Sequence, residues 1–417
     1  MAVNEPSASG GGGPPAGLGS GQQRRLLERL AAQPRRPRAL AAFDEFFRRQ
    51  QWLADLHNDS RPAVGQLCGF VPEELVLACG LRPLRLETGY DEAARLGGQR
   101  LGSETCSEVR ALAGLLESGG GLLERLQLLL LPTSCDAKRG LAEGLDWPCP
   151  VELLQVPAAP QQQRSRRLWL GEMERLLGRL SRLGHRPRRR HLLEASALVN
   201  RRAELVRRLN RLRRAEYPPL SGADALEVMQ AAALADIAWW NEHATALLDE
   251  LAAHPRQPAA GEAAPVRLLL AGSPILWPDL KIPLAAAASG GQVVIDDLCN
   301  LTAWLDRPLV IDEFNRASLI EAAAERVLLS CACPCLIGQA EPAQRLLRLA
   351  ADWRVQGVVF HQLVSCTPFA MCSSRCASRV SSAGLGWLEL HSQFGEEEEA
   401  PLRNRLEAFC EMLRDRP

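Results

Sequence analysis

The sequence has no long apolar run and almost no lysine. No uninterrupted hydrophobic segment approaches the roughly 20 residues that a membrane-spanning helix requires, so we expect no membrane association. Lys138 and Lys281 are the only lysines among the 49 basic residues, and all the others are arginines. A lysine kept against such a bias suggests a site that needs a compact ammonium group rather than a planar guanidinium, and chance survival is the alternative.

The chain also has no excess of charge of one sign and no recognisable export signal. Its 49 acidic residues balance the 49 basic ones, which gives no general attraction to nucleic acid or to an anionic membrane. Residues 1–22 are rich in Gly, Ser and Pro, and we expect a disordered tail on a cytoplasmic protein. The 13 cysteines are then not expected to form disulfides, because the cytosol keeps thiols reduced.

The chain does contain a repeated alternation of short apolar runs and helical segments. Runs such as 126–131 and 266–271 have the length of buried strands. This pattern predicts an α/β fold with two doubly wound, mainly parallel-sheet domains, a helical insert and a helical N-terminal segment. The expected units are the tail (1–22), N-terminal helices (23–60), a first α/β domain (61–160), the helical insert (161–251), a linker (252–265) and a second α/β domain (266–417).

Two arginine runs, 188–190 and 207–214, resemble a nucleic-acid-binding surface at first sight. They accompany an ordinary apolar helix stripe, however, and no aromatic residues that could stack on bases lie between them. We therefore interpret them as solvated helix faces.

Three cysteines lie where a parallel-sheet fold places its ligands. Cys135 and Cys366 follow predicted strands, and Cys106 precedes a predicted helix. The N-terminus of a helix favours the thiolate, which is the form that binds iron. The sequence contains no ferredoxin-type run of closely spaced cysteines, so the fold itself would have to assemble such a site.

Nine short segments, spread over about residues 60–415, carry a resemblance to a known family. They are FVPEEL (70–75), ACGLRP (78–83), CSEVR (106–110), CDAKR (135–139), PPLSGAD (218–224), GSPI (272–275), DDLC (296–299), GVV (357–359) and RLEAF (405–409). In this order they make the chain similar to the 2-hydroxyacyl-CoA dehydratase and benzoyl-CoA reductase subunits, a family that includes a double-cubane-cluster branch.

The resemblance implies that Cys106, Cys135 and Cys366 hold one 4Fe–4S cluster with an open site on one iron. It further implies an acyl-CoA thioester substrate, a homologous second subunit and an ATP-dependent iron–sulfur activator protein that supplies one electron. The expected reaction is a radical elimination of water from a 2-hydroxyacyl-CoA, or the related reduction of a benzoyl-CoA. Glu74 matches a family carboxylate near the substrate, and Lys138 lies inside the CDAKR segment; both are catalytic candidates. An ordinary first-turn glutamate is the alternative for Glu74.

Two alternatives within the family remain open. The double-cubane branch is an ATP-dependent reductase of small molecules with an 8Fe cluster, and its additional ligands would be Cys68, Cys299 and Cys333 or Cys331. The chain could instead be a non-catalytic partner subunit. The family's usual Glu-Thr-Asp-Tyr is replaced here by His-Ser-Gln-Phe at 391–394, and Cys372 stands where relatives often have glutamate. These departures favour a changed substrate or a partner role.

Overall fold

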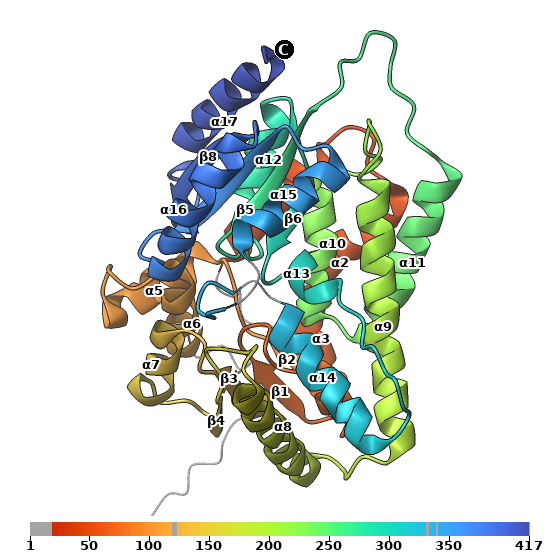
Figure 1. Ribbon diagram of the computed structural model, residues 1–417, viewed down its shortest axis with the longest axis vertical. Coiled ribbons are helices and arrows are strands. Elements are labelled where there is room, and N and C mark those ends of the chain that lie inside the picture. Colours follow the sequence, from red (N-terminus) through yellow and green to blue (C-terminus); the bar gives the residue numbers. More distant parts are fainter. Residues whose placement is uncertain (1–18, 119–122, 331–332, 339–340, 417) are drawn as a thin grey trace, which may run out of the picture.

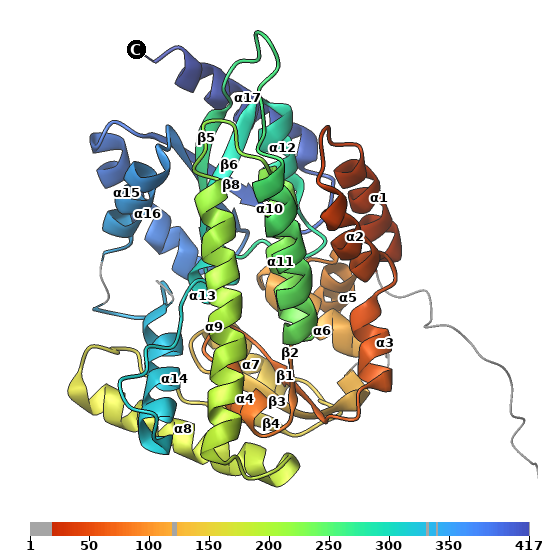
Figure 2. The same cartoon turned by 90° about the vertical axis from the view of Figure 1, so that its right-hand side faces the viewer.

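The computed structural model describes residues 19–118, 123–330, 333–338 and 341–416. The described residues begin with helices, coloured red in Figure 1, that lie along one side of the molecule in the view of Figure 2. They are α1 (Ser20–Ala31), α2 (Ala41–Arg48) and α3 (Gln51–Asn58). Pro34 and Pro37 fall between α1 and α2, as expected for residues that interrupt a helix.

The first sheet has the strand order β2-β1-β3-β4, and all its strands are parallel. Its strands are β1 (Ala63–Gln66), β2 (Arg82–Arg85), β3 (Leu126–Pro132) and β4 (Val151–Leu154). The helices that connect them are α4 (Glu73–Ala78), α5 (Asp91–Leu101), α6 (Ser107–Glu117) and α7 (Asp136–Gly144). Side chains alternate between the two faces of a strand, so successive residues of β3 enter different hydrophobic cores. Leu128 and Leu130 belong to one core, and Leu129 and Leu131 belong to the other.

The second sheet repeats this topology with the order β6-β5-β7-β8. Its strands are β5 (Val266–Gly272), β6 (Gly291–Leu298), β7 (Gly357–Leu363) and β8 (Gly386–Ser392). Helices α12 and α17 pack on each other at one side of it, and α15 and α16 do so at the other. The helices of this part are α12 (Lys281–Ala288), α13 (Thr302–Leu305), α14 (Arg316–Ser330), α15 (Pro342–Trp353), α16 (Thr367–Ser382) and α17 (Glu399–Arg414).

A helical region joins the two sheets. It consists of α8 (Gln163–Leu183), α9 (Arg189–Leu212), α10 (Gly222–Leu234) and α11 (Ile237–Ala253). Helix α9 extends past both sheets and contacts α4 near the first sheet and α13 near the second (Figure 2). The two halves are therefore connected by one continuous helix.

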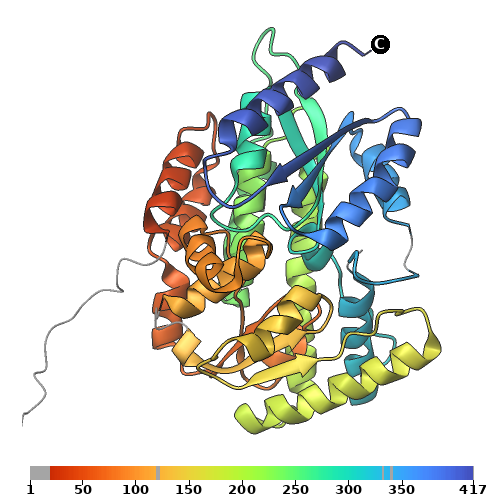
Figure 3. The same cartoon turned by 90° about the vertical axis from the view of Figure 1, so that its left-hand side faces the viewer.

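The N-terminal helices contribute to the core that both sheets share. Phe43, Phe46 and Phe47 are fully buried, and the Phe47 ring stacks on Trp277 with 3.6 Å between ring centroids. Figure 3 shows the N-terminal helices in red along one side of the molecule, next to both the upper and the lower sheet. This segment therefore packs against the rest of the fold as part of its core.

The predicted fold class, α/β with two parallel sheets and helical segments, is confirmed. Two details differ from the predictions. Helix α1 begins at Ser20, inside the predicted tail, because the Gln22 and Gln23 amides donate to the carbonyls of Gly89 and Phe47. Residues 1–18 lie outside the described residues.

The second difference concerns the arginine runs. Arg213 is fully buried and donates to the Val293 carbonyl at 3.0 Å, so the run 207–214 is not solvated throughout. Its neighbours Arg211 and Arg214 are exposed, as predicted. None of the helices that the structure describes combines the length and the apolar composition that a membrane crossing requires.

Candidate functional site

Each sheet has one topological switch point. There the chain stops adding strands on one side of its first strand and begins to add them on the other side. In the first sheet this point lies between β1 and β3, and in the second between β5 and β7. Ligands of open parallel sheets bind at the carboxyl ends of the strands at such a point. Cys68 and Cys135 follow β1 and β3, and Ser273 and Cys366 follow β5 and β7.

The three cysteines predicted to bind one cluster occupy equivalent positions at the starts of three helices. Cys106, Cys135 and Cys366 are the N-cap residues of α6, α7 and α16. The backbone N–H groups of Val109 and Phe369, each three residues further on, favour the thiolate forms of Cys106 and Cys366. The fold thus places three thiols at the N-termini of helices, two of them in the half with the first sheet and one in the half with the second sheet.

Electrostatic interactions connect each pair of these three side chains. Burial raises the pKa of Cys106 to about 12, and the Glu108 carboxylate and the repulsion that thiolates at Cys366 and Cys135 would exert add to this increase. Burial raises the pKa of Cys366 to about 11, with smaller contributions from Glu108 and Cys135. Cys106 and Cys366 are therefore neutral thiols in the free protein near pH 7, and metal binding must displace their protons.

The donor set fits an iron–sulfur cluster better than a single ion. Within the described ranges, no group of three His, Cys, Asp or Glu side chains is arranged to hold one metal ion. In a cluster, inorganic sulfide bridges the irons, so the protein thiolates bind different metal atoms and need not converge on one point. Soft thiolate ligands are those that iron–sulfur clusters use.

The additional cysteines of the double-cubane alternative come from both halves of the chain, because Cys68 follows β1, Cys299 follows β6 and Cys333 lies between α14 and α15. Cys68 adopts a left-handed conformation, with φ 64°, and its sulfur lies 3.8 Å from the Ser134 hydroxyl. Cys299 interacts electrostatically with the Arg85 guanidinium. Cys333 forms a hydrogen bond with Cys335, which in turn interacts with Lys138. Cys331 lies outside the described residues.

Lys138 is the centre of a buried ion network that links these cysteine-bearing segments. Its ammonium lies 2.5 Å from a carboxylate oxygen of Glu108 and 3.2 Å from one of Glu87. The Arg85 guanidinium donates to the other Glu87 oxygen at 2.9 Å. The Glu87 carboxylate also accepts the backbone N–H of Cys68. We refer to Arg85, Glu87, Glu108 and Lys138 as the ion network.

The network contains functional candidates that the sequence did not single out. Burial alone would raise the pKa of Glu87, but the adjacent Arg85 and Lys138 cations lower it to about 2. Glu108 lies in the CSEVR segment, two residues after Cys106, and Arg85 and Glu87 lie at the carboxyl end of β2. That position at a strand end is the signal that could have identified them.

Glu74, the other catalytic candidate, lies in the interior and forms an ion pair. Both of its carboxylate oxygens accept hydrogen bonds from Arg326, at 3.1 and 2.6 Å, and 1% of Glu74 is exposed. Glu73, its neighbour, pairs with Arg202. The bidentate bond fixes the orientation of the Glu74 carboxylate.

The segment that departs from the family pattern connects the end of β8 to α6, the helix that begins after Cys106. Gln393 accepts a hydrogen bond from Arg110 of α6 at 2.6 Å. The Lys281 ammonium, buried beside Asp279, donates to the carbonyls of Gln393 and Gly395. Lys281 therefore provides several short contacts from one compact group, which is consistent with its retention in an arginine-rich chain.

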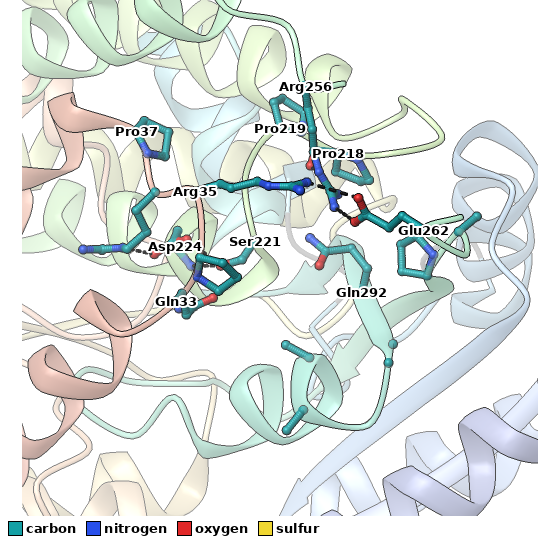
Figure 4. A pocket seen from close by; sticks show the side chains of 18 of the residues that line it. Gln33, Arg35, Pro37, Pro218, Pro219, Ser221, Asp224, Arg256, Glu262 and Gln292 are labelled. Atoms are coloured by element: carbon teal, nitrogen blue, oxygen red, sulfur yellow. Dashed lines mark hydrogen bonds and ion pairs between the residues drawn. The ribbon is translucent and has the colours of Figure 1, made fainter. Parts of the chain in front are cut away.

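A large cavity lies elsewhere, near the amino ends of β5 and β6. It has a volume of about 1180 Å³ and is lined by residues of the α1–α2 connection, α10 and the segment 254–265. Figure 4 shows the facing side chains of Arg35, Arg256 and Glu262, and Glu262 forms ion pairs with both arginines. The predicted ligand cysteines do not line this cavity, so it is distinct from the cysteine site.

Comparisons with known proteins show the family of the chain. The family model described as 2-hydroxyglutaryl-CoA dehydratase, D-component, matches residues 68–413. The provisionally named dehydratase subunit YjiM of Escherichia coli (strain K12) is 26% identical over 388 residues, covering 89% of this chain and 98% of that protein. A benzoyl-CoA reductase subunit of Thauera aromatica is 23% identical over 378 residues, covering 89% of this chain and 95% of that protein.

Proposed function

Because the chain belongs to the 2-hydroxyglutaryl-CoA dehydratase D-component family, we propose that it is an iron–sulfur subunit that acts on an acyl-CoA thioester. The observation that supports the proposal is that Cys106, Cys135 and Cys366 are the N-cap residues of three helices and interact electrostatically with one another. A 4Fe–4S cluster held by these three thiolates would supply one-electron chemistry. The reaction is the elimination of water from a 2-hydroxyacyl-CoA or a benzoyl-CoA-type reduction.

The protein's own residues have separate roles in this proposal. The three thiolates hold the cluster, and the helix N-termini stabilise their charge. Lys138 has three N–H groups, of which two face Glu108 and Glu87, and the third can donate to a substrate oxygen. Glu74, oriented by Arg326, is the second group we propose to contact the substrate.

The proposal also includes partners and a location. The similar proteins are named as a dehydratase D-component and as one subunit of a benzoyl-CoA reductase, which indicates a multi-subunit enzyme. We propose a homologous second subunit and an ATP-dependent iron–sulfur activator protein as the electron donor. A cytoplasmic location accords with the absence of disulfides among the cysteines that the structure describes, since the cytosol keeps cysteines reduced.

A double-cubane reductase is the second candidate function, and Cys68 is the observation that favours it. A non-glycine residue at φ 64° costs roughly 1–3 kcal/mol, and such strain is often found at functional sites. Cys299 and Cys333 lie beside the same ion network, through Arg85 and through Cys335 and Lys138. In that case Cys68, Cys299 and Cys333 would be further ligands of an 8Fe cluster.

Anaerobic iron and sulfide analysis with EPR spectroscopy tests the proposal. We expect about four irons per chain for the first function and about eight for the second. Cys106→Ser should abolish the chromophore, because a hydroxyl replaces a thiolate ligand. Cys149→Ser is the matched control, since 7% of Cys149 and 8% of Cys106 are exposed, and it should retain its iron. Iron bound equally by both variants would rule out the proposed ligand set.

A further inference from the structure

The ion network has a feature that the proposed ligand set does not explain. Its four charged groups are buried, with 8% of the Lys138 side chain exposed and 4% each of the Arg85 and Glu87 side chains. Two cations and two carboxylates give a net charge of zero. Removing a charge from water costs free energy, and the attraction within a buried ion pair offsets that cost only when its geometry is good. Four buried charges therefore stabilise a core less than apolar side chains of similar size would.

The network also joins the segments that carry cysteines. Glu108 belongs to α6, which begins after Cys106, and Lys138 belongs to α7, which begins after Cys135. Glu87 binds the Cys68 backbone N–H and Lys138 together. Charges on Lys138 and Glu108 act on the cysteine sulfurs, since Lys138 favours the thiolate of Cys68 and Glu108 disfavours those of Cys106 and Cys366.

We propose that Glu87 and Glu108 are positioning residues that hold the Lys138 ammonium beside the cysteines, and that the balanced charge of this network sets the reduction potential of the bound cluster. The inference rests on the proposed function, because it needs a cluster at Cys106, Cys135 and Cys366. Reduction adds a negative charge to the cluster. A nearby cation stabilises the reduced state and raises the potential, whereas a nearby carboxylate lowers it.

Two substitutions that remove charges of opposite sign test this role. Glu87→Gln keeps an amide oxygen as acceptor for Cys68 N–H but leaves the network with a net positive charge, so the midpoint potential should rise. Lys138→Met leaves it with a net negative charge, so the potential should fall. In the double variant Glu87→Gln/Lys138→Met the two changes cancel, and the potential should return toward the wild-type value. Damage to the fold alone would not produce shifts of opposite sign that compensate each other.

The measurement is an anaerobic redox titration of the purified holoprotein, followed by EPR spectroscopy. Asp224→Asn is the matched control, because the Asp224 side chain is 3% exposed, pairs with Arg36 at 2.7 Å and lies away from the predicted ligand cysteines, in the wall of the large cavity. It should lose stability but keep its potential. If Glu87→Gln does not retain iron, Glu108→Gln tests the same expectation, because it also removes one negative charge and should raise the midpoint potential.

The outcomes separate the two proposals. Wild-type protein without iron would refute the proposed function itself. Iron in every variant with unchanged potentials, or shifts of the same sign in Glu87→Gln and Lys138→Met, would overturn the inference and leave the proposed function standing.

Discussion

At the scale of single residues, burial shifts the pKa values of Cys106 and Cys366 in the candidate site and of one histidine outside it. His361 of β7 donates to or accepts from the Ser392 hydroxyl at 2.9 Å, and 2% of the residue is exposed. Burial, assisted by the nearby Lys281 cation, lowers the pKa of His361 from 6.5 to about 3. The folded protein therefore keeps this imidazole neutral well below the pH at which an exposed histidine becomes charged.

This histidine makes stability depend on pH in a defined direction. Its folded-state pKa lies below its unfolded value, so its contribution is complete above about pH 6.5 and is lost as the pH falls toward 3. In that window the free energy of unfolding should decrease by up to about 1.4 kcal/mol per pH unit from this group. His361→Gln should flatten the decrease between pH 6.5 and 4.5 in urea unfolding experiments. Parallel curves for the variant and the wild type would contradict this assignment.

At the scale of elements, most helices and strands could be predicted because their patterns are local. The apolar runs 126–131 and 266–271 form β3 (Leu126–Pro132) and β5 (Val266–Gly272). The meeting of Cys106 with Cys366 could not be derived from periodicity, since it depends on how the two sheets are joined. Arg326 is a further example, because its partner Glu74 is distant in sequence and only packing of α14 near α4 brings them together.

The close packing of α5 and α6 is an element-scale feature that positions Cys106. A Cβ atom added to Gly114 would lie 1.8 Å from the Ala93 carbonyl oxygen, so Gly114→Ala must push α6 away from α5. We expect a loss of roughly 1–3 kcal/mol in the free energy of unfolding, as for other overpacked cores, together with weakened iron retention. Chemical denaturation and iron analysis of the purified variant check both effects.

Gly178→Ala is the control for this prediction. Gly178 lies within α8, away from both helix ends, and is exposed to solvent. No other atom lies within 4 Å of a Cβ atom added at this position. Alanine there should stabilise the protein by about 0.5–1 kcal/mol, because alanine has the higher helix propensity. If Gly114→Ala were as stable as Gly178→Ala, the tight approach of the two helices would not position α6.

At the scale of the whole molecule, the chain joins its two sheets in two ways, through α9 and through a core shared with the N-terminal helices. Ion pairs outside that core add to the second connection. Arg25 and Arg29 of α1 pair with Glu396 and Glu399, which belong to the acidic run near the end of the chain. This acidic run follows the segment that departs from the family pattern, and it contacts the N-terminal helix. Exposed pairs of this kind stabilise little, so the apolar contacts should dominate.

Phe47 is the residue whose removal tests this connection. Its ring is fully buried against Trp277, which lies in the segment following β5, so Phe47→Ala removes a contact between the N-terminal helices and the second sheet region. Truncation of a buried phenylalanine typically costs about 3–5 kcal/mol. Phe314→Ala, at a position 58% exposed, should change stability little.

Thermal unfolding followed by circular dichroism and by limited proteolysis distinguishes the possible results. If the N-terminal helices integrate both halves, Phe47→Ala should lower the single transition temperature of the whole chain. Release of residues 19–58 without a change in that transition would show instead that these helices are a dispensable attachment.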